Sequence, residues 1–264
     1  MKTSIIRSIL WTHTAIAGLV GLAFYLAPGL AASWWPWPLP GLAARFVGAL
    51  LISGATYSGL TAMARTNLPL AGMLLTASGY SLIALVGTLH GGELGWTTAL
   101  MVWAAIWAVV ALIFAVLLIV VQSRRPHHIA AAQPLPPAAR IFFTLHMLLV
   151  APVGLVMYLA PVWAQSYWPW TLSPINIRLI GAMFVVTAAL SFWCRRQRAC
   201  EAVAPALATY GMFTLLVLIA SFIHFSLFNP ARLITWVFVA VYILVASGAW
   251  YLLWAQTRSR PALG

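Results

Sequence analysis

A segment near the start of the chain recurs 133 residues later, and this duplication constrains the fold more than any other feature of the sequence. Residues 25–28 (YLAP) and 35–37 (WPW) return as residues 158–161 and 168–170. Between His13 and Ala55, 18 of 43 positions are identical to the position 133 residues on. Identity at this level is far above chance, so the two parts of the chain are predicted to share one fold.

Each half contains four apolar segments bounded by charged residues or by Pro and Gly. Most of them reach the roughly 20 residues that a helix needs to cross the hydrocarbon core of a bilayer. The chain is only 6% charged, whereas about 25% is usual for a soluble domain. We therefore predict an all-α integral membrane protein with eight transmembrane helices. Their predicted ranges are 5–30, 42–63, 69–90, 96–121, 141–162, 175–194, 204–227 and 233–255.

The duplication divides these helices into two four-helix repeats, residues 1–122 and 140–264, joined by a linker over 123–139. A repeat with an even number of helices begins and ends on the same side of the membrane. Both repeats then enter from that side, which predicts parallel repeats about a pseudo-twofold axis along the membrane normal. The linker carries the run PLPP and is predicted to be a cytoplasmic connector with little regular structure.

The basic residues predict the orientation. With both termini inside, eleven of the fourteen Lys and Arg lie on the inner side, and only Arg45, Arg178 and Arg232 lie outside. Lys and Arg resist translocation, so the expected location is the inner (cytoplasmic) membrane with both termini cytoplasmic. A net charge of +12 in a soluble protein would suggest nucleic acid. Here the expected partners are the bilayer and other membrane-protein subunits, not nucleic acid.

The Trp- and Pro-rich connections at the outer side contain Trp37 in the first half and Trp170 in the second. One interpretation is an aromatic belt at the membrane interface, where an indole meets wet headgroups. The other is a lid over a ligand pocket. Arg45 and Arg178 lie about one turn inside the following helices, where each would bind a lipid headgroup or contribute to an anion or carbonyl site on the axis. Gly48 and Gly181 lie three residues further on and are predicted to allow close helix packing.

Four histidines form two pairs at two predicted membrane depths. His13 and His146 lie some 6–8 residues into the first and fifth helices, and His90 and His224 lie at the outer ends of the third and seventh. Paired histidines at two depths are how membrane b-type cytochromes hold two haems. A chlorophyll or a quinone is an alternative cofactor. The competing interpretation is that each histidine bonds a neighbouring helix, a contact that contributes only about 0.6 kcal/mol on average.

Several kinds of chemistry have no candidate residues. Neither acidic residue lies in the centre of a predicted helix, so an ion-coupled transporter is not favoured. The sequence contains no P-loop, HExxH or GxSxG motif, no metal-ligand spacing and no credible catalytic set. Cys194 and Cys200 are expected to be reduced thiols.

The leading hypothesis is therefore a non-catalytic membrane subunit that binds an apolar cofactor and associates with an electron-transfer or photosynthetic complex. One alternative is a facilitator for a small solute along the repeat interface, and another is a purely structural or lipid-organising protein.

Overall fold

The computed structural model describes residues 3–89, 95–122 and 133–258. Within these ranges the chain is helical apart from loops and one isolated β-bridge, and eight helices are long and apolar enough to cross a membrane. This confirms the all-α class and supports a multi-pass membrane protein. The eight helices are α1 (Thr3–Leu26), α3 (Gly41–Met63), α4 (Leu70–Leu89), α5 (Thr98–Gln122), α6 (Pro137–Leu159), α8 (Pro174–Arg195), α9 (Cys200–Ile223) and α10 (Leu233–Arg258).

Three of these helices end earlier than the sequence predicts. The predicted helix 204–227 is α9, which begins at Cys200 and ends at Ile223. The other two end before a proline. The predicted helices 5–30 and 141–162 stop at Leu26 and Leu159, and the chain then forms short helices, α2 (Pro28–Ala32) and α7 (Pro161–Tyr167). Proline lacks an N–H group and clashes with the preceding turn, so each helix breaks at the residue before it. The two break residues have nearly the same backbone angles, φ −122° and ψ 60° at Ala27 and φ −128° and ψ 58° at Ala160.

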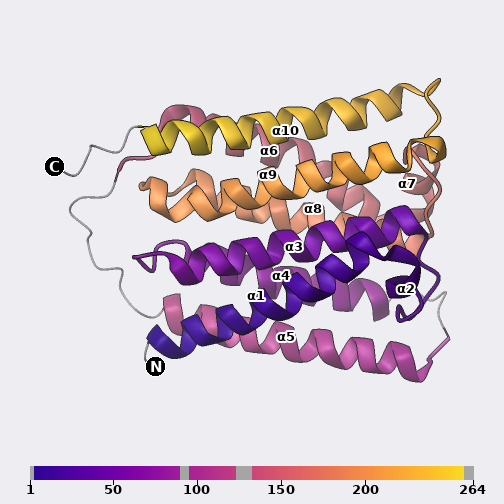
Figure 1. Cartoon of the computed structure of the whole chain (residues 1–264), viewed down its shortest axis with the longest axis horizontal. Helices are drawn as coiled ribbons and strands as arrows, with labels where there is room; N and C mark the ends of the chain where they lie inside the picture. Colours follow the sequence, from indigo (N-terminus) through magenta and orange to yellow (C-terminus); the bar gives the residue numbers. More distant parts are fainter. Residues whose placement is uncertain (1–2, 90–94, 123–132, 259–264) are drawn as a thin grey trace.

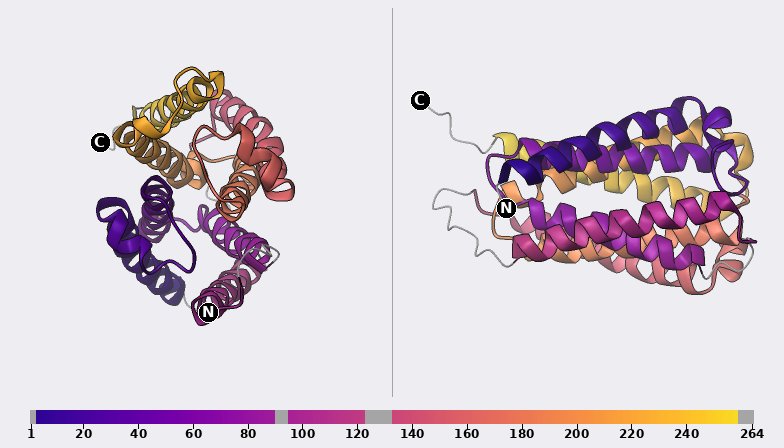
Figure 2. Two further views of the ribbon diagram at one scale, coloured as in Figure 1. Left: turned by 90° about the vertical axis from the view of Figure 1, so that its right-hand side faces the viewer. Right: turned by 90° about the horizontal axis from the view of Figure 1, so that it is seen from below.

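The eight helices form an inner and an outer group. The inner helices are α3, α8 and α9, in which more than half of the apolar span is buried, and α4, in which 39% is buried. In the outer helices α1, α5, α6 and α10 less than a third is buried. The end-on view in Figure 2 shows four pairs, α1 with α3, α4 with α5, α6 with α8 and α9 with α10, around a common centre. The outer helices expose large apolar side chains such as Leu19, Leu112 and Leu244. Apolar surface on this scale suits a lipid environment rather than water.

The inner helices pair across the two halves of the sequence. Helix α3 packs against α9, and α4 packs against α8, while α3 and α4 touch each other only slightly. Two tyrosine hydrogen bonds also join the two halves. Tyr25 Oη donates to the Leu216 carbonyl at 2.8 Å, and Tyr158 Oη donates to the Ile83 carbonyl at 3.0 Å. Residue 216 is 133 positions after residue 83, so the two bonds join corresponding positions in opposite halves. Both ends of the described chain lie at the same end of the bundle (Figure 1).

Glycines set the distance between α1 and α3 and between α6 and α8. A Cβ atom on Gly48 would lie 2.7 Å from the Tyr25 backbone nitrogen, and one on Gly181 would lie 2.7 Å from that of Tyr158. Real Cβ atoms do not approach backbone so closely, so only glycine permits these two crossings. The predicted close packing at both glycines is confirmed.

The end of the predicted linker is ordered. Leu135 N donates to the Arg198 carbonyl at 2.8 Å, and Cys200 N donates to the Gln133 carbonyl at 2.9 Å, around an antiparallel bridge between Pro134 and Ala199. Helix α6 then begins at Pro137, within the predicted range of the linker. Residues 123–132 lie outside the described part of the chain.

Candidate functional site

The two connections that carry the WPW motif lie at the end of the bundle opposite the chain termini, which the sequence predicts to be the outer end (Figure 1). Each connection turns the second tryptophan of its motif into the protein. Trp37 and Trp170 are each only 5% exposed, whereas the nearby Trp34 and Trp163 are 68% and 57% exposed. Prolines around each turn restrict the backbone, which helps to hold the inward conformation. The aromatic-belt interpretation therefore suits the exposed pair and does not describe Trp37 and Trp170, which are core residues at the outer end of the bundle.

Trp37 makes a hydrogen bond between the two halves. Its indole Nε1 donates to Asn176 Oδ1 on α8 at 3.0 Å, and both residues are buried. Trp35 and Trp103 of α5 contact the Trp37 ring edge-to-face at centroid distances of 5.3 and 5.4 Å. Such geometry is favourable for aromatic rings. Trp37 is therefore fixed by one polar bond and two ring contacts.

Trp170 is held by ring contacts alone. Phe228 and Phe238 lie 5.0 and 5.4 Å from its ring. Its Nε1 is buried and has no acceptor in the described part of the chain. The residue 133 positions before Asn176 is Ala43, which has no oxygen in its side chain to offer Trp170. The two corners share a sequence motif but differ in how their indole N–H groups are satisfied.

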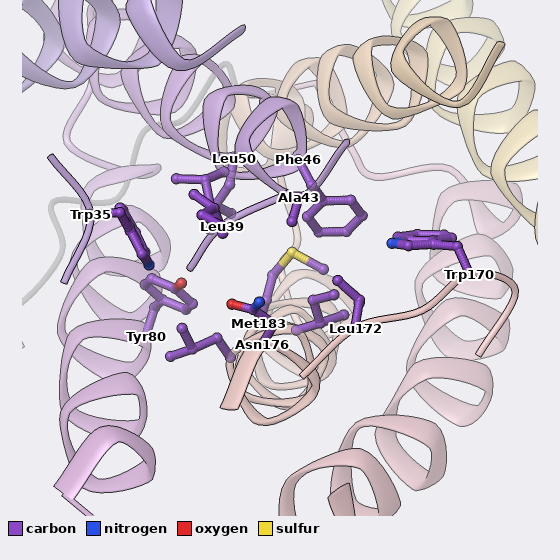
Figure 3. A pocket seen from close by; sticks show the side chains of 13 residues that line it. Trp35, Leu39, Ala43, Phe46, Leu50, Tyr80, Trp170, Leu172, Asn176 and Met183 are labelled. Atoms are coloured by element: carbon purple, nitrogen blue, oxygen red, sulfur yellow. The ribbon is translucent and has the colours of Figure 1, made fainter. Parts of the chain in front are cut away.

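A pocket lies between these corners, where α3 approaches α8. Its free volume is about 40 Å³, and most of its lining is aliphatic or aromatic. Figure 3 shows Trp35 and Trp170 on opposite sides, with Tyr80 of α4 and Asn176 of α8 supplying polar groups. Residues from both halves of the sequence form this wall. The geometry suits a small apolar group that approaches a few fixed hydrogen-bonding atoms.

Arg45 closes the outer end of α1 rather than entering this pocket. Its Nε donates to the Tyr25 carbonyl at 3.1 Å, one of the last carbonyls of the helix, which have no donor within the helix. Its Nη1 donates to Nε2 of His224, the residue after α9. Burial, and then the positive charge of Arg45, lower the pKa of His224, which favours the neutral acceptor form of this imidazole.

Arg178 occupies the corresponding place in the second half, where it interacts electrostatically with Tyr158. Neither arginine lines the pocket between the corners. His90, the sequence partner of His224, lies outside the described residues. Of the site residues predicted at the outer end, the structure therefore brings Arg45 and His224 into contact.

His13 and His146 each bond a serine on the adjacent helix. His13 Nδ1 lies 3.0 Å from Ser58 Oγ, and His146 Nδ1 lies 2.9 Å from Ser191 Oγ. Each bond spans 45 residues, and the two serines are themselves 133 positions apart. Each serine has a second side-chain partner, since Ser58 Oγ lies 2.8 Å from Thr14 Oγ1 and Ser191 Oγ lies 3.0 Å from Tyr210 Oη. These contacts join α1 to α3 and α6 to α8, and each histidine is satisfied within its own helix pair.

Sequence reasoning missed three of the polar residues in these sites. Ser58 and Ser191 lie just beyond the 43-position window of the repeat, and extending the same offset finds both. Asn176 is an amide in an apolar helix at a position where the repeat has Ala43, and that mismatch was the available signal. Within residues 3–89, 95–122 and 133–258, no three His, Cys, Asp or Glu side chains gather as a metal site would require.

Comparison of the chain with protein-family models, curated proteins and solved structures gave no match.

Proposed function

We propose that this protein is a non-catalytic membrane protein that binds a small apolar molecule in the pocket between α3 and α8. The observation that carries this proposal is the convergence of both outer corners on one apolar pocket, which Trp35 and Trp170 flank. Of the three predicted cofactors, haem and chlorophyll are broad macrocycles that bind through their metals to axial ligands such as histidine, and no histidine among the described residues lines this pocket. The ring edge of a quinone, or another small carbonyl compound, suits the pocket better.

The proposal includes the architecture and setting that the sequence predicts. Two four-helix repeats related by a pseudo-twofold axis would place the pocket near that axis, at the outer end. The matched bonds of Tyr25 and Tyr158, and of His13 and His146, support such a relation. The setting is the inner membrane with both termini cytoplasmic, and the partners are lipids and other membrane subunits.

The lining of the pocket favours binding over passage. Phe46 and Leu50 of α3 and Ile180 and Met183 of α8 line the pocket with apolar side chains. A facilitator along the same axis would need polar groups there to replace the water around a solute. The pocket is better suited to hold an apolar molecule than to conduct a polar one.

Filling the pocket tests the proposal. Ala43→Leu adds three carbons to the wall, while Ala105→Leu on the exposed face of α5 is the matched control. We expect at least one apolar compound to co-purify with the wild-type protein and with Ala105→Leu, and to be lost from Ala43→Leu. Mass spectrometry of solvent extracts measures this directly. The same extract from all three proteins would contradict the proposal.

A further inference from the structure

Three buried N–H groups of the pocket lining have no acceptor among the residues that the structure describes. They are Nε1 of Trp35, Nε1 of Trp170 and Nδ2 of Asn176. The orientation of the Asn176 amide follows from chemistry, because the Trp37 indole can only donate and must therefore face Oδ1. In Figure 3 the indole nitrogen of Trp170 and the amide of Asn176 point toward the interior of the pocket. The pocket therefore offers donors in excess of acceptors.

Buried donors without acceptors are few in native proteins, because each lost its hydrogen bond to water on folding. Trp170 and Asn176 are each 5% exposed, so solvent does not restore those bonds. Two such groups at one pocket, with Trp35 on the side opposite Trp170, call for an acceptor from outside the chain. A ligand that supplies one removes a cost that the folded protein otherwise carries.

We infer that the pocket recognises the uncharged carbonyl group of an apolar molecule, an inference that rests on the proposed function. A carbonyl oxygen has two lone pairs and no hydrogen, so it accepts from Trp170 or from Asn176 without needing an acceptor in return. Ketones and quinones belong to this class. The aliphatic walls from Leu39, Leu50 and Ile180 contact the carbons that flank the carbonyl.

Charge excludes the other strong acceptors. Within residues 3–89, 95–122 and 133–258, no Lys, Arg or His lines the pocket, and transferring an anion from water into an apolar wall without a countercharge is very costly. Water is a poorer match than a carbonyl, because it brings two O–H groups to a wall that offers few acceptors. The acceptors at this wall are the second lone pair of Asn176 Oδ1 and the Tyr80 hydroxyl.

The volume of the pocket limits how much of the ligand lies inside it. A cavity of about 40 Å³ accommodates about three water-sized groups when one needs about 10–15 Å³. This is room for a carbonyl and its neighbouring carbons, with the remainder of the molecule outside. Met183 lines the same space, and its flexible thioether can repack around a bulkier end.

A matched pair of probes tests the inference on the full-length protein in lipid nanodiscs. The first is 2-undecanone with a ¹³C-labelled carbonyl, and the second is 2-methyl-1-undecene, in which a methylene group replaces the carbonyl oxygen at nearly constant shape. We expect the ketone to bind about tenfold more tightly, as for a buried donor gaining its acceptor. Its labelled carbonyl stretch should shift to lower wavenumber on binding, which isotope-edited infrared spectroscopy detects.

Variants locate the donor. Trp170→Phe removes the N–H group, and the preference for the ketone should fall several-fold, while the control Trp163→Phe in the exposed part of α7 keeps it. Loss of ring volume affects both probes alike, so the ratio of their Kd values isolates the hydrogen bond. Ala43→Asn, which offers Trp170 an acceptor from the chain itself, should lower the same ratio in a second, independent way.

The outcomes separate the two proposals. Equal binding of ketone and alkene to the wild-type protein, with both lost in Ala43→Leu, overturns the carbonyl inference and leaves the pocket as an apolar site. A ketone preference that survives both Trp170→Phe and Ala43→Asn also overturns it. Binding of neither probe, with water alone in the pocket, contradicts the carbonyl inference and the proposed function together.

Discussion

The two outer corners share their sequence motif and their backbone break but not their hydrogen bonds. Trp37 has an acceptor in Asn176, whereas Trp170 has none because residue 43 is alanine. The shared residues are those that shape the backbone and the helix crossing. The residue that differs lies at the contact between the halves. The proposed duplication accounts for the shared scaffold, and we propose that the one unmatched side chain gives the pocket its chemical preference.

The largest expected effect tests whether the two scaffolds are equivalent. Gly48→Ala and Gly181→Ala each place a Cβ atom 2.7 Å from backbone, so each pair of helices must separate. We expect each substitution to lower the free energy of unfolding by about 3 kcal/mol, the upper part of the usual range for overpacking. Thermal unfolding in detergent measures this. Gly29→Ala is the control, because nothing lies within 4 Å of its added Cβ; unequal losses would show that the two crossings differ.

A second substitution makes the two corners alike by removing the acceptor. Asn176→Leu leaves the Trp37 N–H group buried without a partner, which should cost about 2 kcal/mol of stability. The opposite change, Ala43→Asn, should be neutral or stabilising because Trp170 gains a partner. Denaturation of both variants under one condition compares the corners directly. Similar losses from the two changes would mean that the unmatched position does not control the stability of the corners.

The histidine–serine contacts of the two halves provide a comparison with a smaller expected loss of stability. Ser58→Ala removes the partner of His13, and we expect a loss of about 0.6 kcal/mol, as is usual for hydrogen bonds between membrane helices. Ser191→Ala should cost more, because His146, which loses its serine partner, is buried whereas His13 is only half-buried. The melting temperatures of the two variants give the order. A larger loss at Ser58 would reverse the expected ranking.

The smallest effect depends on pH at the outer end of the first half. The pKa of His224 is lowered in the folded protein, so its neutral form contributes stability above the ordinary value of about 6.5. As the pH falls below that value, the unfolded chain takes up a proton first and the contribution is lost. His224→Gln should remove this dependence. Melting curves of both proteins from pH 7.5 to about 5 measure it, and parallel curves would contradict the expectation.

Sequence reasoning predicted the helices well and the site only partly. Eight apolar segments fix where the chain can be helical, because their length and apolar character act locally. Proline is a weaker guide, since α6 continues through Pro152 and α9 through Pro205. The early ends of α1 and α6 follow from Pro28 and Pro161, which were visible but were placed inside the predicted helices. Gly48 and Gly181 were correctly assigned to close packing, because a small side chain on a helix has few other uses.

The packing of α3 against α9 and of α4 against α8 was not predictable from one sequence. Nothing in the apolar pattern of α3 distinguishes α9 from α4 as its neighbour, since both offer similar side chains. For the same reason the burial of Trp37 could not be separated from an interfacial position. Both depend on which helices meet, and only the three-dimensional arrangement shows that Asn176 lies within reach of Trp37.

The packing of α3 against α9 and of α4 against α8 has a consequence for biosynthesis. The ribosome completes residues 1–122 before α8 and α9 exist, so the inner faces of α3 and α4 have no partners at that stage. A newly made first half is thus an incomplete unit that must stay open to the second, and its misassembly with another copy is the foreseeable error. A single half able to pair with itself in this way would also be a plausible starting point for the duplication.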